Sequence, residues 1–193
     1  MNFEAIKLVS EAFEKVLETA FAAANIPGDV YVGPLDDPNA EDAAAVLFLY
    51  RLVVNADLRS AEHRVPAVDP LQPAIVHQGA LPLDLYYLLT AGTRQTGGEL
   101  QSLTVLGCAM QALNDRPELV GVGVGGDTVR VTLEPASSDE LSRIWTLFPT
   151  VNFRTSVAYL ASPVWIDPAI ARTVAPPVIR EPHRAGHFDR GAA

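Results

Sequence analysis

Two long apolar runs constrain most strongly what this chain can fold into. AVLFLYRLVV spans residues 45–54, and PLDLYYLLTAG spans residues 82–92 with a single charged residue, Asp84. Runs of this length, rich in valine and leucine, are typical of strands that are buried on both faces of a sheet. The two runs therefore predict a sheet on which other elements pack.

The pattern of an amphipathic helix occurs three times. Apolar residues recur at helical spacing in residues 2–25, 99–113 and 137–148. The third segment opens with a capping box, in which Ser137 and Glu140 satisfy the first backbone amides of the helix. The second segment carries a helical stripe of apolar residues, which are Leu100, Leu103, Leu106, Met110 and Leu113.

Two further segments are predicted to be strands. Residues 128–133 alternate strictly between apolar and polar side chains, which indicates a half-exposed strand. Residues 156–166 contain Pro163, which favours a sheet edge or a bulge. Residues 55–81 hold several prolines and little periodicity, and are expected to be a long excursion. The order of elements predicts an α+β fold, with a mixed, mainly antiparallel sheet packed by about three helices.

Length, composition and charge limit the class of protein. The chain has 193 residues, enough for one domain with a tail, and we place the domain at residues 1–167 and a proline-rich extended tail at residues 168–193. The net charge of −9 disfavours a surface for nucleic acid or anionic lipid. The single Cys108 fits a reducing cytoplasm. The amino terminus lacks the pattern of a signal peptide, and no window is apolar enough for a membrane helix.

A glycine run at residues 121–126 suggests an enzyme at first sight. Gly121, Gly123 and Gly126 satisfy the G-x-G-x-x-G pattern of dinucleotide-binding proteins. In that fold a helix follows the glycines, whereas here Asp127 and the alternating strand follow them. We therefore predict a hairpin turn, and keep a nucleotide-binding enzyme as a minor alternative.

The titratable residues form no catalytic or metal-binding constellation. Asp84 needs a partner in its buried strand, and Arg51 in the other run is the natural candidate. Cys108 is expected to be a small core residue. The histidines are expected to be surface or loop residues, and no catalytic residue, metal site or cofactor is predicted. The histidines are His63, His77, His183 and His187.

Five stretches, taken together and in order, resemble a known family. They are LFLYRLVVNADLRS (47–60), LPLDLYYLLT (81–90), LGCAMQALNDRPEL (106–119), VRVTLEPASSDELSRIWTLF (129–148) and TSVAYLASPVWID (155–167). Over about residues 3–167 the chain resembles the tube-terminator, or cap, proteins of contractile injection systems, which are phage-tail-like particles made by bacteria. Five ordered blocks are far more specific than one short motif.

The resemblance implies a tail-terminator-like fold and a structural role rather than an enzymatic one. It implies a homohexameric ring that ends the inner tube and joins it to the last sheath layer. The partners would be further copies of the chain, the inner tube protein and the sheath protein. The protein would be cytoplasmic on synthesis and then part of the assembled particle. A baseplate part or connector of a phage-like tail is the alternative structural role.

Three features are expected to make contacts between subunits. Strand 156–166, if it is an edge, could pair with a strand of the sheath protein. Some positions that match the family are candidate interaction residues. The tail could order along a neighbouring subunit on assembly, and plain disorder is the alternative. The candidate residues are Arg59, Asp84 and Arg116 in the domain, and Ile170, Val174, Pro176, Pro177, Val178 and Ile179 in the tail.

Overall fold

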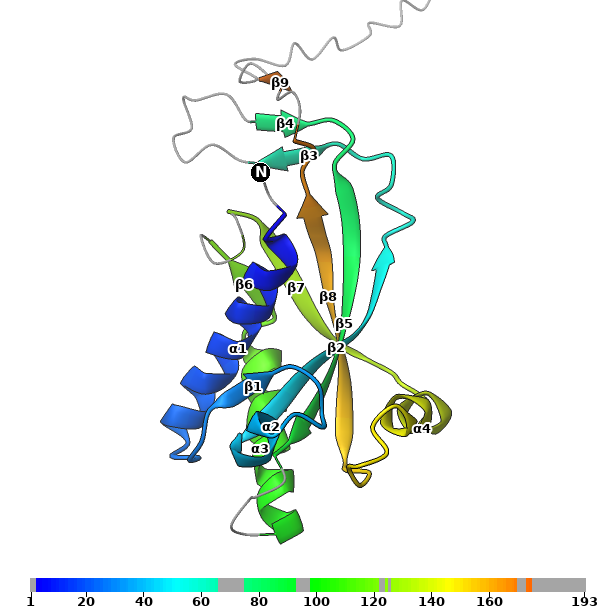
Figure 1. Ribbon diagram of the computed structural model, residues 1–193. Coiled ribbons are helices and arrows are strands. Elements are labelled where there is room, and N and C mark those ends of the chain that lie inside the picture. Colours follow the sequence, from blue (N-terminus) through cyan, green and yellow to red (C-terminus); the bar gives the residue numbers. More distant parts are fainter. Residues whose placement is uncertain are drawn as a thin grey trace, which may run out of the picture.

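The structure is a computed structural model, and it describes residues 3–65, 75–92, 98–121, 124, 126–169 and 173–174. Its centre is a six-stranded sheet with the strand order β1-β2-β5-β8-β7-β6 (Figure 1). All neighbouring strands are antiparallel except β1 and β2, which are parallel. The strands are β1 (Val30–Val32), β2 (Ala45–Val54), β5 (Leu81–Ala91), β6 (Glu118–Val120), β7 (Thr128–Glu134) and β8 (Ser156–Ile166). The predicted α+β class with a mainly antiparallel sheet is confirmed.

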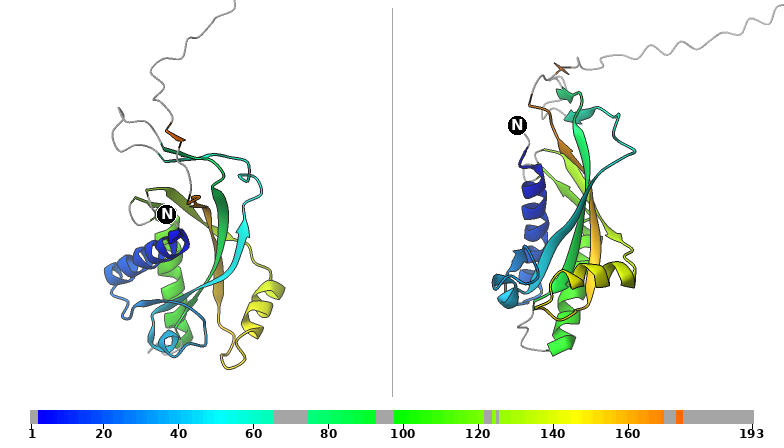
Figure 2. Two further views of the ribbon diagram at one scale, coloured as in Figure 1. Left: turned by 45° about the horizontal axis from the view of Figure 1, so that its top comes forward. Right: turned by 45° about the vertical axis from the view of Figure 1, so that its right-hand side comes forward.

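Helices cover the two faces of this sheet. Helices α1 (Ala5–Ala23) and α3 (Gly98–Asp115) lie on one face, and α4 (Ser138–Thr146) lies on the other (Figure 2). The larger apolar core lies beneath α1 and α3. A second core lies beneath α4 and includes Ala40 of the short helix α2 (Asn39–Asp42). Residues of β2 and β5 contribute to both cores, because alternate side chains of a strand point to opposite faces.

Helix α1 follows directly from its sequence. Val9, Phe13 and Leu17 recur at helical spacing and are all buried. The helix ends at Ala23, and Asn25 just beyond it has a φ of 55°. The Ile26 amide donates a hydrogen bond to the Phe21 carbonyl at 2.9 Å. This hydrogen bond, together with a left-handed residue, is the usual way of satisfying the last carbonyls of a helix.

The capping box predicted for the third helix is confirmed. Ser137 accepts a hydrogen bond from the Glu140 amide, and the Glu140 carboxylate accepts one from the Ser137 amide. The helix then buries Ile144 and Trp145 in the second core, together with Phe148 just beyond its end.

Strand β8 is a central strand and not an edge. It pairs with β5 on one side and with β7 on the other, so the expectation of an edge at residues 156–166 is wrong. The alternative expectation, a bulge, is confirmed, because the β5–β8 register shifts between Leu83 and Leu85, opposite Ser162 and Pro163. A bulge allows a proline inside a sheet because the ladder is already interrupted there.

Strand β2 is buried on both faces only in its first half. Ala45, Val46 and Leu47 are fully buried, whereas Leu52 and Val54 are exposed. The prediction of a strand buried throughout is therefore wrong for its second half. The predicted burial holds better for β5, in which Leu83 through Ala91 are buried except for Asp84 and Tyr86, which are half-buried.

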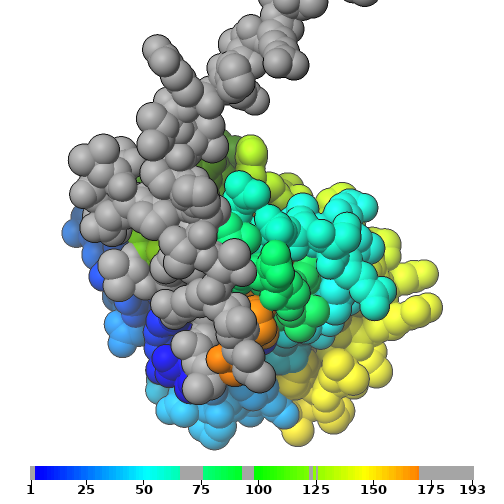
Figure 3. All heavy atoms as spheres, turned by 90° about the horizontal axis from the view of Figure 1, so that it is seen from above, coloured from blue at the N-terminus to red at the C-terminus, as the bar shows by residue number. Residues whose placement is uncertain are grey.

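A small sheet lies next to the first residues of β5 and the last residues of β8 (Figure 1). It consists of β3 (His63–Val65), β4 (Ile75–His77) and β9 (Thr173–Val174), with β4 in the middle. Residues 55–81, expected to be an excursion without strands, thus contain β3 and β4. Strand β9 falls within the predicted tail, and the boundary at residue 167 stays a prediction. Figure 3 views the molecule from this end and shows the turn after β2 in cyan at the surface.

Candidate interaction surfaces

Helix α3 carries an apolar stripe that nothing in the described part of the chain covers. Leu100 is 78% exposed, and Leu103 and Met110 are also exposed. Leu106 and Leu113, which belong to the same predicted helical stripe, are buried instead. The helix has more than one apolar face, and the neighbouring face packs on the sheet and on α1. The residues that it buries are Val105, Leu106, Ala109 and Leu113.

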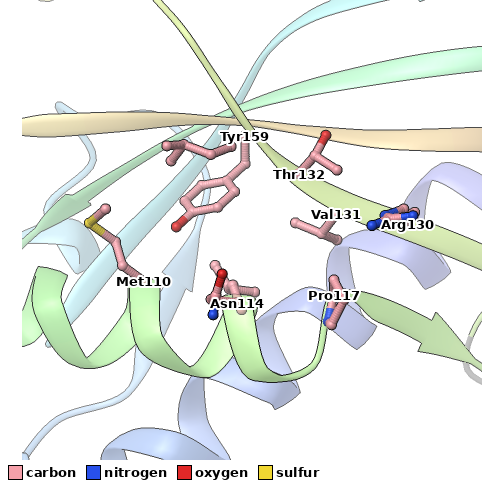
Figure 4. A pocket seen from close by; sticks show the side chains of 9 residues that line it. Met110, Asn114, Pro117, Arg130, Val131, Thr132 and Tyr159 are labelled. Atoms are coloured by element: carbon pink, nitrogen blue, oxygen red, sulfur yellow. The ribbon is translucent and has the colours of Figure 1, made fainter.

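A groove continues this surface between α3 and β7. Met110 and Asn114 of the helix face Val131 and Tyr159 of the sheet across a hollow of about 270 Å³ (Figure 4). Burial raises the pKa of Tyr159 to about 12, so its phenol stays neutral. Leu133, which also lines the hollow, is more than half exposed. Large apolar side chains that gather on a surface commonly mark a site of protein contact. We call Leu100, Leu103, Met110 and Leu133 the α3 surface.

The sheet also has an incompletely paired strand. Strand β1 pairs only with Ala45, Val46 and Leu47 of β2. From Phe48 to Val54, β2 has β5 on one side and no strand of the described residues on the other. Backbone groups on such an edge are available to a strand from another chain.

Asp84 joins two strands to the turn that follows β2. Its Oδ1 accepts hydrogen bonds from Ser162 Oγ at 2.5 Å and from Asn55 Nδ2 at 3.0 Å. The Asn55 side-chain carbonyl in turn accepts from the Leu58 amide at 3.0 Å. Arg51, the predicted partner of Asp84, instead places its guanidinium 4.5 Å from the centre of the Tyr86 ring. The expected Arg51–Asp84 ion pair is wrong, because Val53, not Arg51, is the β2 residue opposite Asp84.

Replacing Asp84 with alanine is expected to lower the free energy of unfolding by about 1 to 3 kcal/mol, because two half-buried donors lose a charged acceptor. Urea unfolding should show a lower midpoint with an unchanged m-value. Asp57→Ala, at an exposed position of the neighbouring turn, is the matched control and should change stability by less than about 0.5 kcal/mol. Equal effects of the two variants would contradict this role of Asp84.

The glycine run forms the predicted hairpin. Strands β6 and β7 are antiparallel partners, and the turn between them begins and ends at Gly121 and Gly126, with φ values of 93° and 91°. The Gly121 carbonyl accepts hydrogen bonds from the amides of Val124 and Gly126. Strand β7 follows the turn directly, where a dinucleotide site would have the amino terminus of a helix. Gly123 lies outside the described residues.

His63 is a buried residue, which corrects the expectation of a surface histidine. Its side chain is only 4% exposed, and its two ring nitrogens lie 2.6 Å from Asp167 and 2.8 Å from Asp127. His77 is also buried, with Nε2 3.7 Å from Asp167. Sequence reasoning missed this cluster because Asp127 and Asp167 are 64 and 104 residues away from His63. No local spacing signals such a cluster.

The comparison with protein families decides where this fold belongs. Residues 8–180 match the family described as the Pvc16 N-terminal domain, which is most of the chain. The chain belongs to the Pvc16 N-terminal domain family. This agrees with the resemblance of residues 3–167 to tube-terminator proteins. No curated protein matches the chain.

Two solved structures share the fold of this Pvc16 N-terminal domain. One is the sheath/tube terminator of PVC, an extracellular contractile injection system, in the extended state. The match to it has a TM-score of 0.56 and 21% sequence identity, and it covers 97% of the chain. The other is the tube-terminating cap of the anti-feeding prophage, with a TM-score of 0.59 and 22% identity over 90% of the chain. The chain spans 65% and 58% of the lengths of these two proteins.

The candidate interaction residues fall in three places in the Pvc16 N-terminal domain. Arg59 is exposed and follows the Asn55–Leu58 turn that Asp84 holds. Arg116 is exposed directly after α3. Val174 lies in β9, opposite Ile75 of β4. The remaining tail candidates lie outside the described residues; they are Ile170, Pro176, Pro177, Val178 and Ile179. The role of all these residues in assembly stays a prediction.

The described part of the chain offers neither a metal-binding cluster nor a membrane-spanning helix. Within residues 3–65, 75–92, 98–121, 124, 126–169 and 173–174, no group of three or more His, Cys, Asp or Glu side chains could hold a metal ion. His183 and His187 lie outside these ranges. None of the helices in the same part of the chain is long and apolar enough to cross a membrane.

Proposed function

We propose that this protein is the structural cap of a bacterial contractile injection system, and that it has no catalytic activity. The observation that carries the proposal is the fold shared with a sheath/tube terminator over 97% of the chain. The second shared fold, that of a tube-terminating cap, points in the same direction. The β6–β7 hairpin removes the glycine run as a reason to expect a nucleotide-binding enzyme.

In the proposed role the chain forms a homohexameric ring that ends the inner tube and joins it to the last sheath layer. Subunits of a ring meet through two different surfaces, one on each side. The α3 surface supports a ring, because a neighbouring subunit of the ring would cover its exposed apolar side chains. The free edge of β2 from Phe48 to Val54, and not β8, is the place for strand pairing with a sheath subunit.

Electron microscopy of particles from a deletion strain tests this role. Loss of the protein is expected to give tubes or sheaths of uncontrolled length, or unstable ones, because nothing stops growth of the tube. Expression of the wild-type protein from a plasmid should restore particles of uniform length. Particles of normal length that lack a baseplate would favour the alternative role as a baseplate part or connector.

A variant of the α3 surface makes the same experiment specific to the ring. The double substitution Leu100→Asp and Leu103→Asp should leave the subunit folded and fail to restore uniform particles, because it places two charges in a subunit contact. Leu147→Asp, at a comparably exposed leucine just after α4, is the matched control and should restore them. Restoration by the double variant would exclude the α3 surface from the ring contact.

A further inference from the structure

His63 lies between two carboxylates that come from different parts of the fold. Nδ1 is 2.6 Å from Oδ1 of Asp167, which directly follows β8. Nε2 is 2.8 Å from Oδ1 of Asp127, which lies in the turn between β6 and β7. His63 itself is the first residue of β3 in the small sheet. One side chain thus connects the small sheet to two segments of the central sheet.

The two contacts require a particular charge state of the ring. A carboxylate can only accept hydrogen bonds, and a neutral imidazole has only one N–H donor. Only the imidazolium form of His63 can donate to Asp127 and Asp167 at the same time. The two distances are typical of charge-assisted hydrogen bonds, which are stronger than neutral ones.

Two other rings of the described residues lie against His63. The Trp165 ring is stacked on His63 with the centroids 4.9 Å apart and the planes 8° from parallel. The His77 ring lies 5.7 Å from His63, and its Nε2 is 3.7 Å from Oδ2 of Asp167. Among the described residues, the titratable groups that face His63 are therefore Asp127, Asp167 and His77.

The balance of these surroundings favours the charged form. Burial by itself would lower the pKa of His63, but the hydrogen bonds to Asp127 and Asp167 and the charges of these carboxylates outweigh it. The pKa of His63 is raised above its ordinary value of 6.5 as a result.

Among the described strands, those of the small sheet do not pair with the central sheet. The strands of the small sheet are two or three residues long, and β4 pairs with β3 and β9 rather than with the six-stranded sheet. Isolated ribbons of this length are marginally stable in water. His63 is the first residue of β3 and lies opposite His77, the last residue of β4. Its two hydrogen bonds therefore act at the point where the small sheet meets the rest of the fold.

We propose that protonated His63 is a pH-sensitive clamp: it fastens the small sheet to the central sheet through Asp127 and Asp167. Loss of the ring proton removes one of the two hydrogen bonds and leaves two carboxylates facing an uncharged ring. The small sheet then opens more often, while the central sheet keeps its own contacts.

The direction of the pH dependence follows from the raised pKa. When the small sheet opens, His63 returns to its ordinary pKa near 6.5. The stabilisation by the clamp is therefore fully present below about pH 6.5 and is lost as the pH rises through the higher pKa of the closed state. The closed state should be favoured at low pH by about tenfold for each unit that separates the two pKa values.

Two measurements on the full chain test the clamp between pH 5.5 and 9. Nuclear magnetic resonance of ¹⁵N-labelled histidine should show both ring nitrogens of His63 still protonated above pH 6.5. Hydrogen exchange, corrected for the intrinsic rate at each pH, should show the protection of the β3 and β4 amides falling over the same range. The amides of β5 are the internal reference and should stay equally protected.

Three variants separate a charged clamp from simple packing. Asp127→Asn supplies an amide that can donate to a neutral ring, so its small sheet should stay protected at all pH values and lose the pH dependence. His63→Gln should lower the protection at pH 6 to the wild-type level at pH 9. Glu62→Gln, at the exposed position next to His63, is the matched control and should behave like the wild type.

A wild-type small sheet with pH-independent protection would overturn the proposal. So would a His63 ring that titrates at or below pH 6.5, or an Asp127→Asn variant with the pH dependence of the wild type.

Discussion

Replacing Phe13 with alanine is expected to lower the free energy of unfolding by about 3 to 5 kcal/mol. Phe13 is fully buried, and its ring meets Tyr87 at 5.3 Å and Tyr159 at 6.0 Å, both in edge-on geometry. These two tyrosines belong to β5 and β8, so the substitution opens a cavity where α1 crosses the centre of the sheet. For a chain of this size the melting temperature should fall by roughly 6 to 20 °C.

The control for this prediction is another phenylalanine near the same helix. Phe3 lies just before α1 and is 71% exposed. Phe3→Ala removes the same atoms without opening a cavity, and should change stability by less than about 0.5 kcal/mol. Denaturant unfolding of the two variants gives the comparison. A Phe13→Ala variant as stable as Phe3→Ala would show that α1 does not pack on the sheet through this ring.

A second large effect is expected from replacing Gly92 with alanine. A Cβ atom at this position would run into the carbonyl oxygen of Ala43, which belongs to the backbone and cannot rotate away. Gly92 also donates its amide to the Ala44 carbonyl at 3.1 Å, and this hydrogen bond holds the end of β5 against the residues before β2. Moving the two segments apart should cost at least about 2 kcal/mol, because it disturbs packed backbone on both sides.

Gly107→Ala is the matched control for Gly92→Ala, and its effect should have the opposite sign. Gly107 lies inside α3, and a Cβ atom there would meet nothing within 4 Å. Alanine in the interior of an exposed helix is favoured over glycine by roughly 0.5 to 1 kcal/mol. Thermal unfolding should therefore show a lower melting temperature for Gly92→Ala and a higher one for Gly107→Ala. The same direction of change in both variants would contradict the proposed close approach at Gly92.

The parts of the fold that could be predicted are those determined by short stretches of sequence. The helical spacing of Val9, Phe13 and Leu17 is enough to predict α1 and its buried face. The alternation in residues 128–133 and the glycines before it are enough to predict the β6–β7 hairpin. Ser137 and Glu140 are three residues apart, and their capping box predicts where α4 begins.

The parts that could not be predicted depend on contacts between distant residues. Whether β8 is an edge strand depends on which segments pair with it. In the structure, β5 pairs with one side of β8 and β7 pairs with the other. Which apolar face of α3 is buried depends on where α1 and the sheet lie, so Leu100 and Met110 could not be distinguished from Leu106 by spacing. The partner of Asp84 depends on the strand register, which places Val53 opposite it.

By itself the sequence determined the longer helices and strands, the α+β class and the family, because periodicity, turn chemistry and ordered motifs are all properties of neighbouring residues. The short strands β3, β4 and β9 carried no such signal. Only the tertiary structure decided which apolar side chains stay exposed, which strand edge stays unpaired among the described residues, and which titratable groups lie in contact. The α3 surface, the free edge of β2 and the burial of His63 between Asp127 and Asp167 all arise in this way. The physical reason is the same for each: burial and electrostatic pairing are set by distance in space, and folding brings together residues that the chain keeps far apart.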